Sequence, residues 1–168
     1  RLTSWSLWTL IGLALLLTYK SSGAGSNIWP AVFGFINPLI VTVIVVIKQR
    51  GKLTKLDRLE QVCLIIGILS LVMWLGMRQS RTLVQYALYI AIIADSCASI
   101  PTIIFVWNNP DKDRPFAWGM FAIAYSLVLF AITEHTFSNY ILPIYMFVAA
   151  FSIAFPLMIW RIKKKTPL

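Results

Sequence analysis

Residues 83–118 read LVQYALYIAIIADSCASIPTIIFVWNNPDKDRPFAW, and this stretch decides how the rest of the chain is interpreted. It begins as a long apolar segment with one acid near its middle, Asp95, and a proline six residues later, Pro101. A short polar corner follows at 108–114, and Pro115 then opens another apolar segment. An acid and a proline inside a membrane span are both costly, so the segment is a candidate functional element rather than a plain anchor.

The overall composition is that of a membrane protein. The 168 residues are 59% hydrophobic and only 12% charged, whereas about a quarter of residues are charged in soluble domains. A net charge of +9 is also typical of nucleic-acid-binding proteins, but here the cations lie in short loops between apolar segments. The sequence has no zinc-ligand spacing, phosphate-binding glycine loop or nucleophile elbow. We therefore predict no catalytic residue, metal, cofactor or nucleic-acid partner, and no enzymatic activity.

Six apolar segments come close to the roughly 20 residues that a helix needs to cross a bilayer. They predict an all-α protein, a polytopic bundle of transmembrane helices at 4–19, 28–47, 59–77, 82–107, 116–133 and 139–160. Of the 15 Lys and Arg residues, only Lys20, Arg78 and Arg81 fall on one side of this topology. The positive-inside rule then places the C-terminus in the cytoplasm.

The chain repeats its own pattern of apolar segments and breaks. When residue 1 is laid on residue 114, Trp5 falls on Trp118 and Pro30 on Pro143, and no gap is needed. The matched segments enter the membrane from the same side, so the predicted repeat is parallel. We expect a first repeat at 1–52, a linker helix in 53–81 and a second repeat at 82–168.

The two repeats are unequal, because the second contains three apolar segments and the first contains two. A plan of three plus one plus three helices, with its first helix absent from this chain, explains the difference. A six-helix protein with an unequal repeat is the alternative. The matched pair Trp5 and Trp118 is predicted to anchor the membrane interface. The pair one turn deeper, Trp8 and Phe121, is predicted to pack, with a place along a pathway as the alternative.

The acid of the fourth segment needs a specific environment. A charge at the middle of a membrane costs several kcal/mol unless it is paired, wetted or protonated, and no Lys or Arg lies at a matching depth of any span. That leaves a protonated carboxyl, a water-filled cavity, or hydrogen bonds to Asp95 from Ser96, Ser99 or a tyrosine such as Tyr125 or Tyr145. A solute or proton site and a protonated acid that joins helices both remain open.

Residues between 95 and 118 form a pattern in which an acid and a Pro-Thr pair share one helix. Trp and Pro stand at the end of that helix, and an acidic corner precedes another Trp. The residues are Asp95, Ser96, Ser99, Pro101, Thr102, Trp107, Pro110, Asp113 and Trp118. Together with the three-plus-one-plus-three plan, they resemble the SWEET and PQ-loop superfamily, in particular its small bacterial membrane proteins. Thr102 departs from the family pattern, in which Gln follows this proline.

The resemblance implies a protein of the bacterial inner membrane in which two helix bundles rock around a site at the membrane midplane. It implies that Pro101 acts as a gating hinge, whereas from the residues alone a static bend explains this proline equally well. Pro38 in the second segment is interpreted in the same way. It also implies that Asn37, next to Pro38, contacts the solute. From the residues alone, Asn37 is equally well explained as a hydrogen-bonding residue between helices.

We therefore predict a transporter of a small polar solute, such as a sugar, a nucleoside-like compound or a vitamin, that works by alternating access. The candidate solute-binding residues are Asp95, Asn37, Ser99 and Tyr125. The lipid bilayer, a proton and a second copy of the chain are the other candidate partners. The alternative is a receptor, sorting or assembly protein that uses the same bundle without transport. The two functions differ in whether Asp95 and Asn37 face a shared cavity.

Overall fold

The computed structural model describes residues 2–49 and 55–164. Within these ranges the chain is helical, with short turns and no strand, so the predicted all-α class is confirmed. The elements are α1 (Leu2–Ser21), η1 (Ser26–Ile28), α2 (Trp29–Gln49), α3 (Arg58–Met77), α4 (Arg81–Asn108), α5 (Pro115–Val128), η2 (Leu129–Ala131) and α6 (Phe137–Lys164). The predicted boundary between residues 52 and 53 and the end of the basic tail at 165–168 lie outside the described residues.

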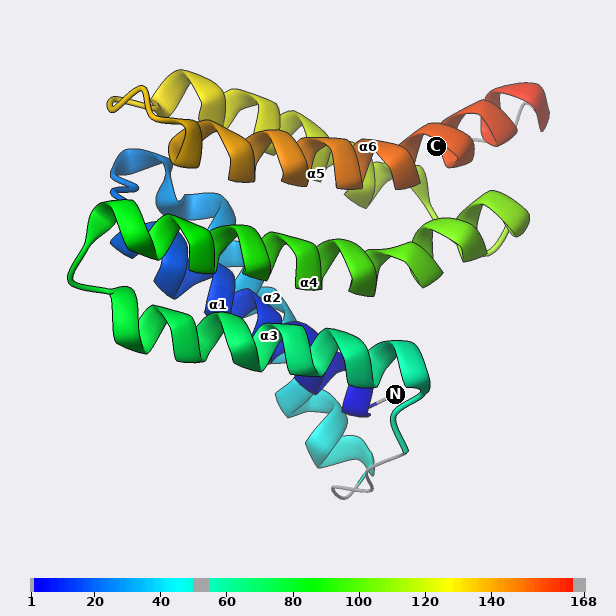
Figure 1. Cartoon of the computed structure of the whole chain (residues 1–168). Helices are drawn as coiled ribbons and strands as arrows, with labels where there is room; N and C mark the ends of the chain where they lie inside the picture. Colours follow the sequence, from blue (N-terminus) through cyan, green and yellow to red (C-terminus); the bar gives the residue numbers. More distant parts are fainter. Residues whose placement is uncertain (1, 50–54, 165–168) are drawn as a thin grey trace.

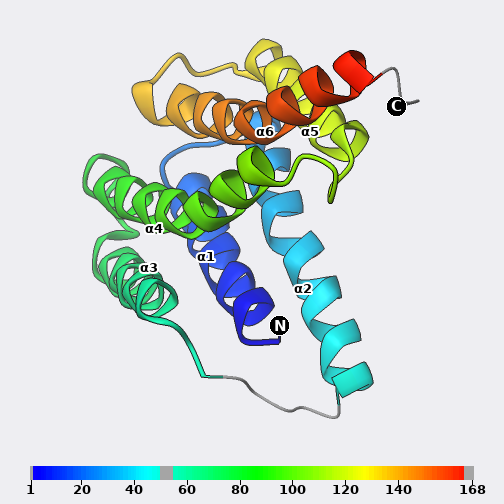
Figure 2. The ribbon, with the colours of Figure 1, turned by 90° about the vertical axis from the view of Figure 1, so that its right-hand side faces the viewer.

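Five of these helices form a ring, and α3 packs on its outside. Around the ring, α1 contacts α2 and α4, α4 contacts α6, and α6 contacts α5, while α2 and α5 only just touch. The remaining helix, α3, lies against α1 and α4. Figure 1 shows the helices side by side, and Figure 2 shows the ring from the end at which α1 begins and α6 ends. We call this the terminal end of the bundle and the opposite one the far end.

Local sequence signals set several helix ends. Asp57 caps α3, because its Oδ1 accepts from the backbone N–H of Glu60 at 2.8 Å and the Glu60 side chain accepts from the N–H of Asp57 at 3.0 Å. Ser80 caps α4 through the N–H of Leu83, and Pro115 starts α5, where a missing N–H costs nothing. These caps explain why the predicted starts of the third, fourth and fifth segments agree with the structure to within a residue.

Two predicted boundaries are wrong at the ends of α5 and α6. The fifth segment was expected to reach residue 133, but α5 ends at Val128 and a 3₁₀ turn follows, because the N–H of Leu129 bonds back to carbonyls only two and three residues before it. The sixth was expected to end at residue 160, but α6 continues to Lys164. Basic side chains stabilise the last turn of a helix, where carbonyl groups are exposed.

The six-span prediction is confirmed only in part. Among the described residues, four helices are long and apolar enough to cross a membrane, namely Ser26–Lys48, Arg58–Met77, Arg81–Asn108 and Phe137–Lys164. The segment Pro115–Ala131 is apolar but shorter. Large apolar side chains also cover the outside, as at Ile65 and Phe130. These features are consistent with an integral membrane protein, while the repeat and its domain division stay predictions.

The helix α1 lies at the centre of the bundle and is held by close contacts. Its Ile11, Ala14 and Leu15 are buried in the main core together with small residues of α4, including Ala91 and Ala94. Small side chains on α4 allow the two helices to approach closely. On its other side α1 meets α2 at two glycines, Gly12 and Gly34, where a Cβ added to Gly12 would overlap the carbonyl oxygen of Gly34.

Candidate functional site

A cavity of about 880 Å³ lies inside the ring, and all five ring helices line it. On α1 the lining runs from Ser4 to Leu15. At the terminal end it includes Asp113, in the turn before α5, and Trp118, in the first turns of that helix. The cavity therefore extends from the terminal end of the bundle to about the middle of its helices.

All four predicted solute-binding residues line this one cavity. Asp95 and Ser99 come from α4, Asn37 from α2 and Tyr125 from α5. The structure thus brings together residues from three helices, although their role in binding stays a prediction. The two predicted hinges differ in position, since Pro38 lines the cavity and Pro101 is exposed on the surface of α4.

Asp95 is the buried charge of the cavity. It lies midway along α4 with 6% of its surface exposed. The hydroxyl of Tyr145, on α6, donates to Oδ2 of Asp95 at 2.7 Å. The second oxygen, Oδ1, has no hydrogen-bond partner among the described residues. A buried carboxylate is stabilised by several hydrogen bonds or by a cation, so Asp95 has unused capacity for a ligand.

Of the hydrogen-bond donors predicted as alternatives for Asp95, a tyrosine bonds to its carboxylate and the two nearby serines do not. Ser96 donates to the backbone carbonyl of Ile92 at 2.7 Å, and Ser99 donates to the backbone carbonyl of Asp95 at 2.7 Å. A serine inside a helix commonly bonds the carbonyl four residues before it, and this competes with more distant acceptors. The carboxylate is therefore left with Tyr145 as its partner in the described chain.

The amide of Asn37 is also available. Asn37 is exposed, lies near the middle of α2 and lines the cavity. It has no hydrogen-bond partner among the described residues, so the expected hydrogen bond between helices is not formed. An amide has two donors and an acceptor, and all of them remain free for a molecule in the cavity.

Aromatic residues line much of the cavity. On α5, Trp118, Phe121 and Tyr125 follow one another along the helix, and the rings of Phe121 and Tyr125 are stacked with centroids 6.1 Å apart. Trp5 and Trp8 line the cavity from α1. The sequence marked both Trp-containing pairs as repeat mates but predicted anchoring and packing for them. The place of Trp5 and Trp118 on the cavity wall was not predicted, whereas a place along a pathway was the alternative considered for Trp8 and Phe121.

The terminal end of the cavity has an acid as well. Asp113 Oδ2 accepts from the indole N–H of Trp118 at 3.0 Å, and its Oδ1 accepts from the backbone N–H of Arg114 at 2.7 Å. These two bonds fix the carboxylate beside the first aromatic residue of α5. Asp113 therefore holds the start of the aromatic row in place.

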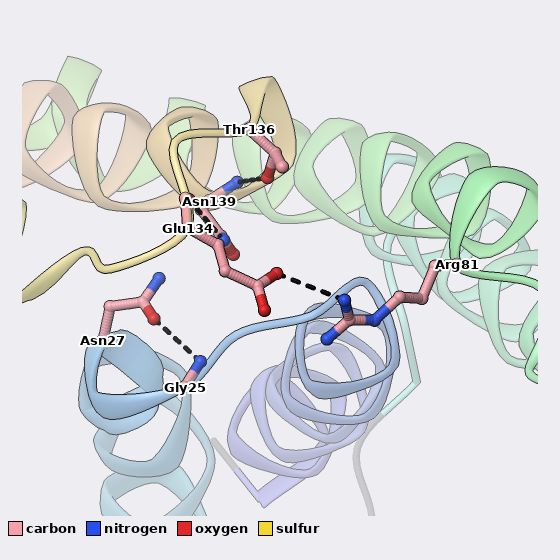
Figure 3. Close-up of polar contacts among 6 residues, drawn as sticks. All are labelled: Gly25, Asn27, Arg81, Glu134, Thr136 and Asn139. Carbon is pink, nitrogen blue, oxygen red and sulfur yellow. Dashed lines mark hydrogen bonds and ion pairs between the residues drawn. The ribbon is translucent and has the colours of Figure 1, made fainter.

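Polar groups close the far end of the bundle, and sequence analysis did not identify them as a connected set. Tyr19 is fully buried at the end of α1; its hydroxyl donates to the backbone carbonyl of Asn139 at 2.8 Å and accepts from the side-chain amide of Asn27. Asn27 Oδ1 in turn accepts from the N–H of Gly25 at 2.9 Å (Figure 3). The chain of bonds links the ends of α1, α2 and α6.

The loop before α6 is bonded to the same polar groups at the far end. The side-chain amide of Asn139 donates to the backbone carbonyl of Glu134 at 2.8 Å, and the Glu134 carboxylate pairs with Arg81 at 3.2 Å (Figure 3). We call Tyr19, Asn27, Asn139, Glu134 and Arg81 the far-end network. The wall of the cavity ends at Leu15 on α1, one turn before Tyr19. The network therefore separates the cavity from the far end.

The far-end network lacks a sequence signal because its members lie in or next to three separate connections between helices. The single hint is a set of polar residues at segment ends, and such residues are ordinary in loops.

Searches against protein-family models, curated proteins and solved structures found no match for this chain.

Proposed function

We propose that the protein carries a small polar solute across a membrane, with the cavity as its binding site and alternating access as its mechanism. The observation that supports this most directly is that Asp95 and Asn37, from different helices, share one cavity and each have an unpaired polar atom. A dry contact between helices would have paired these atoms with protein groups.

The shape of the cavity supports the same function. It reaches the terminal end and is closed at the far end by the far-end network, as expected of a transporter in a state open to one side. The terminal end holds most of the Lys and Arg residues of the described helices, so we assign it to the cytoplasm. The opposite state requires the far-end network to break and the terminal end to close.

The predicted repeat fits this mechanism. The matched residues Trp5 and Trp118, and the matched residues Trp8 and Phe121, line the cavity from α1 and α5. Two related helices on different parts of the wall suit a rocking motion of two halves around a central site. In this proposal Pro38 and Pro101 are the hinge residues, since each removes a backbone hydrogen bond within its helix.

One observation favours a second function. The bond from Tyr145 to Asp95 joins α6 to α4, and a protonated acid in that bond would act as a structural link in a receptor or assembly protein that does not transport. Such a protein would bind a ligand in the cavity without moving it, or would bind none.

Filling the cavity tests the proposal. Ala150 lines the cavity from α6 and is buried, whereas Val148 on the same helix is 53% exposed and is not among the lining residues. We expect Ala150→Trp to reduce solute uptake at least about tenfold, because overpacking removes room for the solute. Val148→Trp adds the same side chain outside the cavity and should keep uptake near the parent value.

The measurement is uptake into proteoliposomes of a panel of sugars, nucleosides, amino acids and small vitamins, with equal amounts of folded protein for each variant. Uptake that Ala150→Trp leaves unchanged would exclude the cavity as the path. Saturable binding of a panel member without any uptake would move the assignment to the receptor class.

A further inference from the structure

The charged groups in the cavity wall are all of one sign. Among the described lining residues there are two carboxylates, Asp95 and Asp113, and no Lys, Arg or His. The two basic residues that flank Asp113 in the sequence, Lys112 and Arg114, are exposed in the turn before α5 and are not part of the cavity wall. A cavity with carboxylates and no basic side chain repels anions and attracts cations.

One carboxylate, Asp113, lies at the start of an aromatic row, and the other, Asp95, lines the same cavity from α4. Trp118, Phe121 and Tyr125 are spaced three and four residues apart on α5, with ring centroids 6.2 Å apart for the first pair and 6.1 Å apart for the second. The row begins at Trp118, which is bonded to Asp113, and continues along the wall to Tyr125. The faces of such rings carry negative charge and attract ammonium groups.

Asp95 has a carboxylate oxygen available to a positive partner. It is more than nine-tenths buried, receives one hydrogen bond from Tyr145, and has Oδ1 unpartnered among the described residues. The hydroxyl groups of a neutral polyhydroxylated solute need hydrogen-bond partners when they leave water. Here the polar side chains in the wall are few and small, and one of them, Ser99, has its hydrogen bonded to the backbone.

We propose that the occupant of the cavity is an organic cation, an ammonium group on an apolar or aromatic body. The ammonium lies against Asp95 Oδ1 and the Tyr125 ring, and the body lies along Phe121 and Trp118. This inference rests on the proposed solute site and names the class of solute that the site takes. Asp113 at the terminal end attracts the cation into the aromatic row.

The test compares matched ligands on the full chain in lipid nanodiscs by isothermal titration calorimetry. The probes are phenethylammonium and benzyltrimethylammonium, the neutral alcohol 2-phenylethanol, which has the size and ring of the first probe, and glucose. On the parent protein we expect both cations to bind at least about tenfold more tightly than the alcohol, from the combined ion pair and ring contacts.

Two variants assign this preference to Asp95. Asp95→Asn keeps the shape of the side chain and removes its charge, so it should reduce the preference for the cation over the alcohol to about twofold or less. Asp111→Asn removes the same charge from an exposed turn residue outside the wall and should leave the preference unchanged. If Asp95→Asn does not fold, the comparison of cation and alcohol on the parent protein still decides the outcome.

The possible results separate this inference from the transport proposal. Equal binding of cation and alcohol, or a cation preference that survives in folded Asp95→Asn, overturns the cation inference and leaves the solute site in place. Binding of glucose or another neutral panel solute, with no cation bound, does the same. Absence of binding by every probe and every panel solute, together with absence of uptake, overturns both.

Discussion

Replacing Gly12 by Ala is expected to destabilise the protein by about 1–3 kcal/mol, the usual range for overpacking a tight contact. A Cβ at Gly12 would overlap the carbonyl oxygen of Gly34 and lie 2.9 Å from the Cα of Phe35. Both obstacles are backbone atoms, so no flexible side chain can move away. α1 and α2 would have to separate, and because both helices belong to the ring, the cavity wall would shift with them.

The matched control is Gly119→Ala on α5, where nothing described lies within 4 Å of the new methyl group. Alanine is about 1 kcal/mol more favourable than glycine inside a helix, so this variant should be as stable as the parent or more so. The measurement is thermal unfolding of the three proteins in one detergent, followed by circular dichroism. A midpoint for Gly12→Ala equal to that of Gly119→Ala would contradict the α1–α2 contact described here.

Tyr19→Phe is expected to weaken the closure at the far end. The hydroxyl of Tyr19 accepts from the amide of Asn27 and donates to the carbonyl of Asn139, and both asparagines are about 99% buried. Loss of the hydroxyl leaves both groups without their partner, and a buried unsatisfied polar group costs about 1–3 kcal/mol. Asn139 Oδ1 already has no hydrogen-bond partner among the described residues. The variant therefore increases the number of buried polar groups without a hydrogen bond at the far end.

This prediction has an accessibility readout in addition to stability. In a background with Cys63→Ala and Cys97→Ala, a Leu15→Cys substitution places a thiol at the inner end of the cavity wall. In liposomes, a membrane-impermeant thiol reagent added on the far-end side should label this thiol several-fold faster in Tyr19→Phe than in the parent.

Tyr86→Phe serves as the control, because Tyr86 is 55% exposed and lies outside the far-end network. It should change neither the unfolding midpoint nor the labelling rate. Equal labelling of Leu15→Cys in the Tyr19→Phe and Tyr86→Phe backgrounds would show that the hydroxyl of Tyr19 does not hold the far end closed.

The helices themselves were predictable because each is an apolar run bounded by strong local signals. Asp57, Ser80 and Pro115 are such signals, and the helices that follow them begin within one residue of the prediction. The end of α5 was not predictable in the same way. Apolar residues continue past Val128 into the 3₁₀ turn, so hydropathy alone gives no indication of where the helix changes form.

The sequence allowed the residues of the candidate site to be predicted, but not the hydrogen bonds between them. An acid within an apolar segment can be recognised from the sequence as a candidate functional residue, because placing it in lipid costs free energy. Its partner does not, since the choice of Tyr145 over Tyr125 depends on the rotation and height of α6 relative to α4. The far-end network could not be predicted from the sequence, because it depends on backbone carbonyls and on three connections between helices that meet in space.

The shortness of α5 has a consequence for the surrounding lipid. With 14 residues, at 1.5 Å per residue the helix is about 21 Å long, against a hydrocarbon core of about 30 Å. Its ring neighbours α6 and α2 have 28 and 21 residues, so the hydrophobic mismatch is local to one side of the bundle. A bilayer relieves such a mismatch by thinning next to the short helix. Since α5 carries the aromatic row of the cavity, we expect the acyl-chain length of the surrounding lipid to affect the shape of the cavity wall.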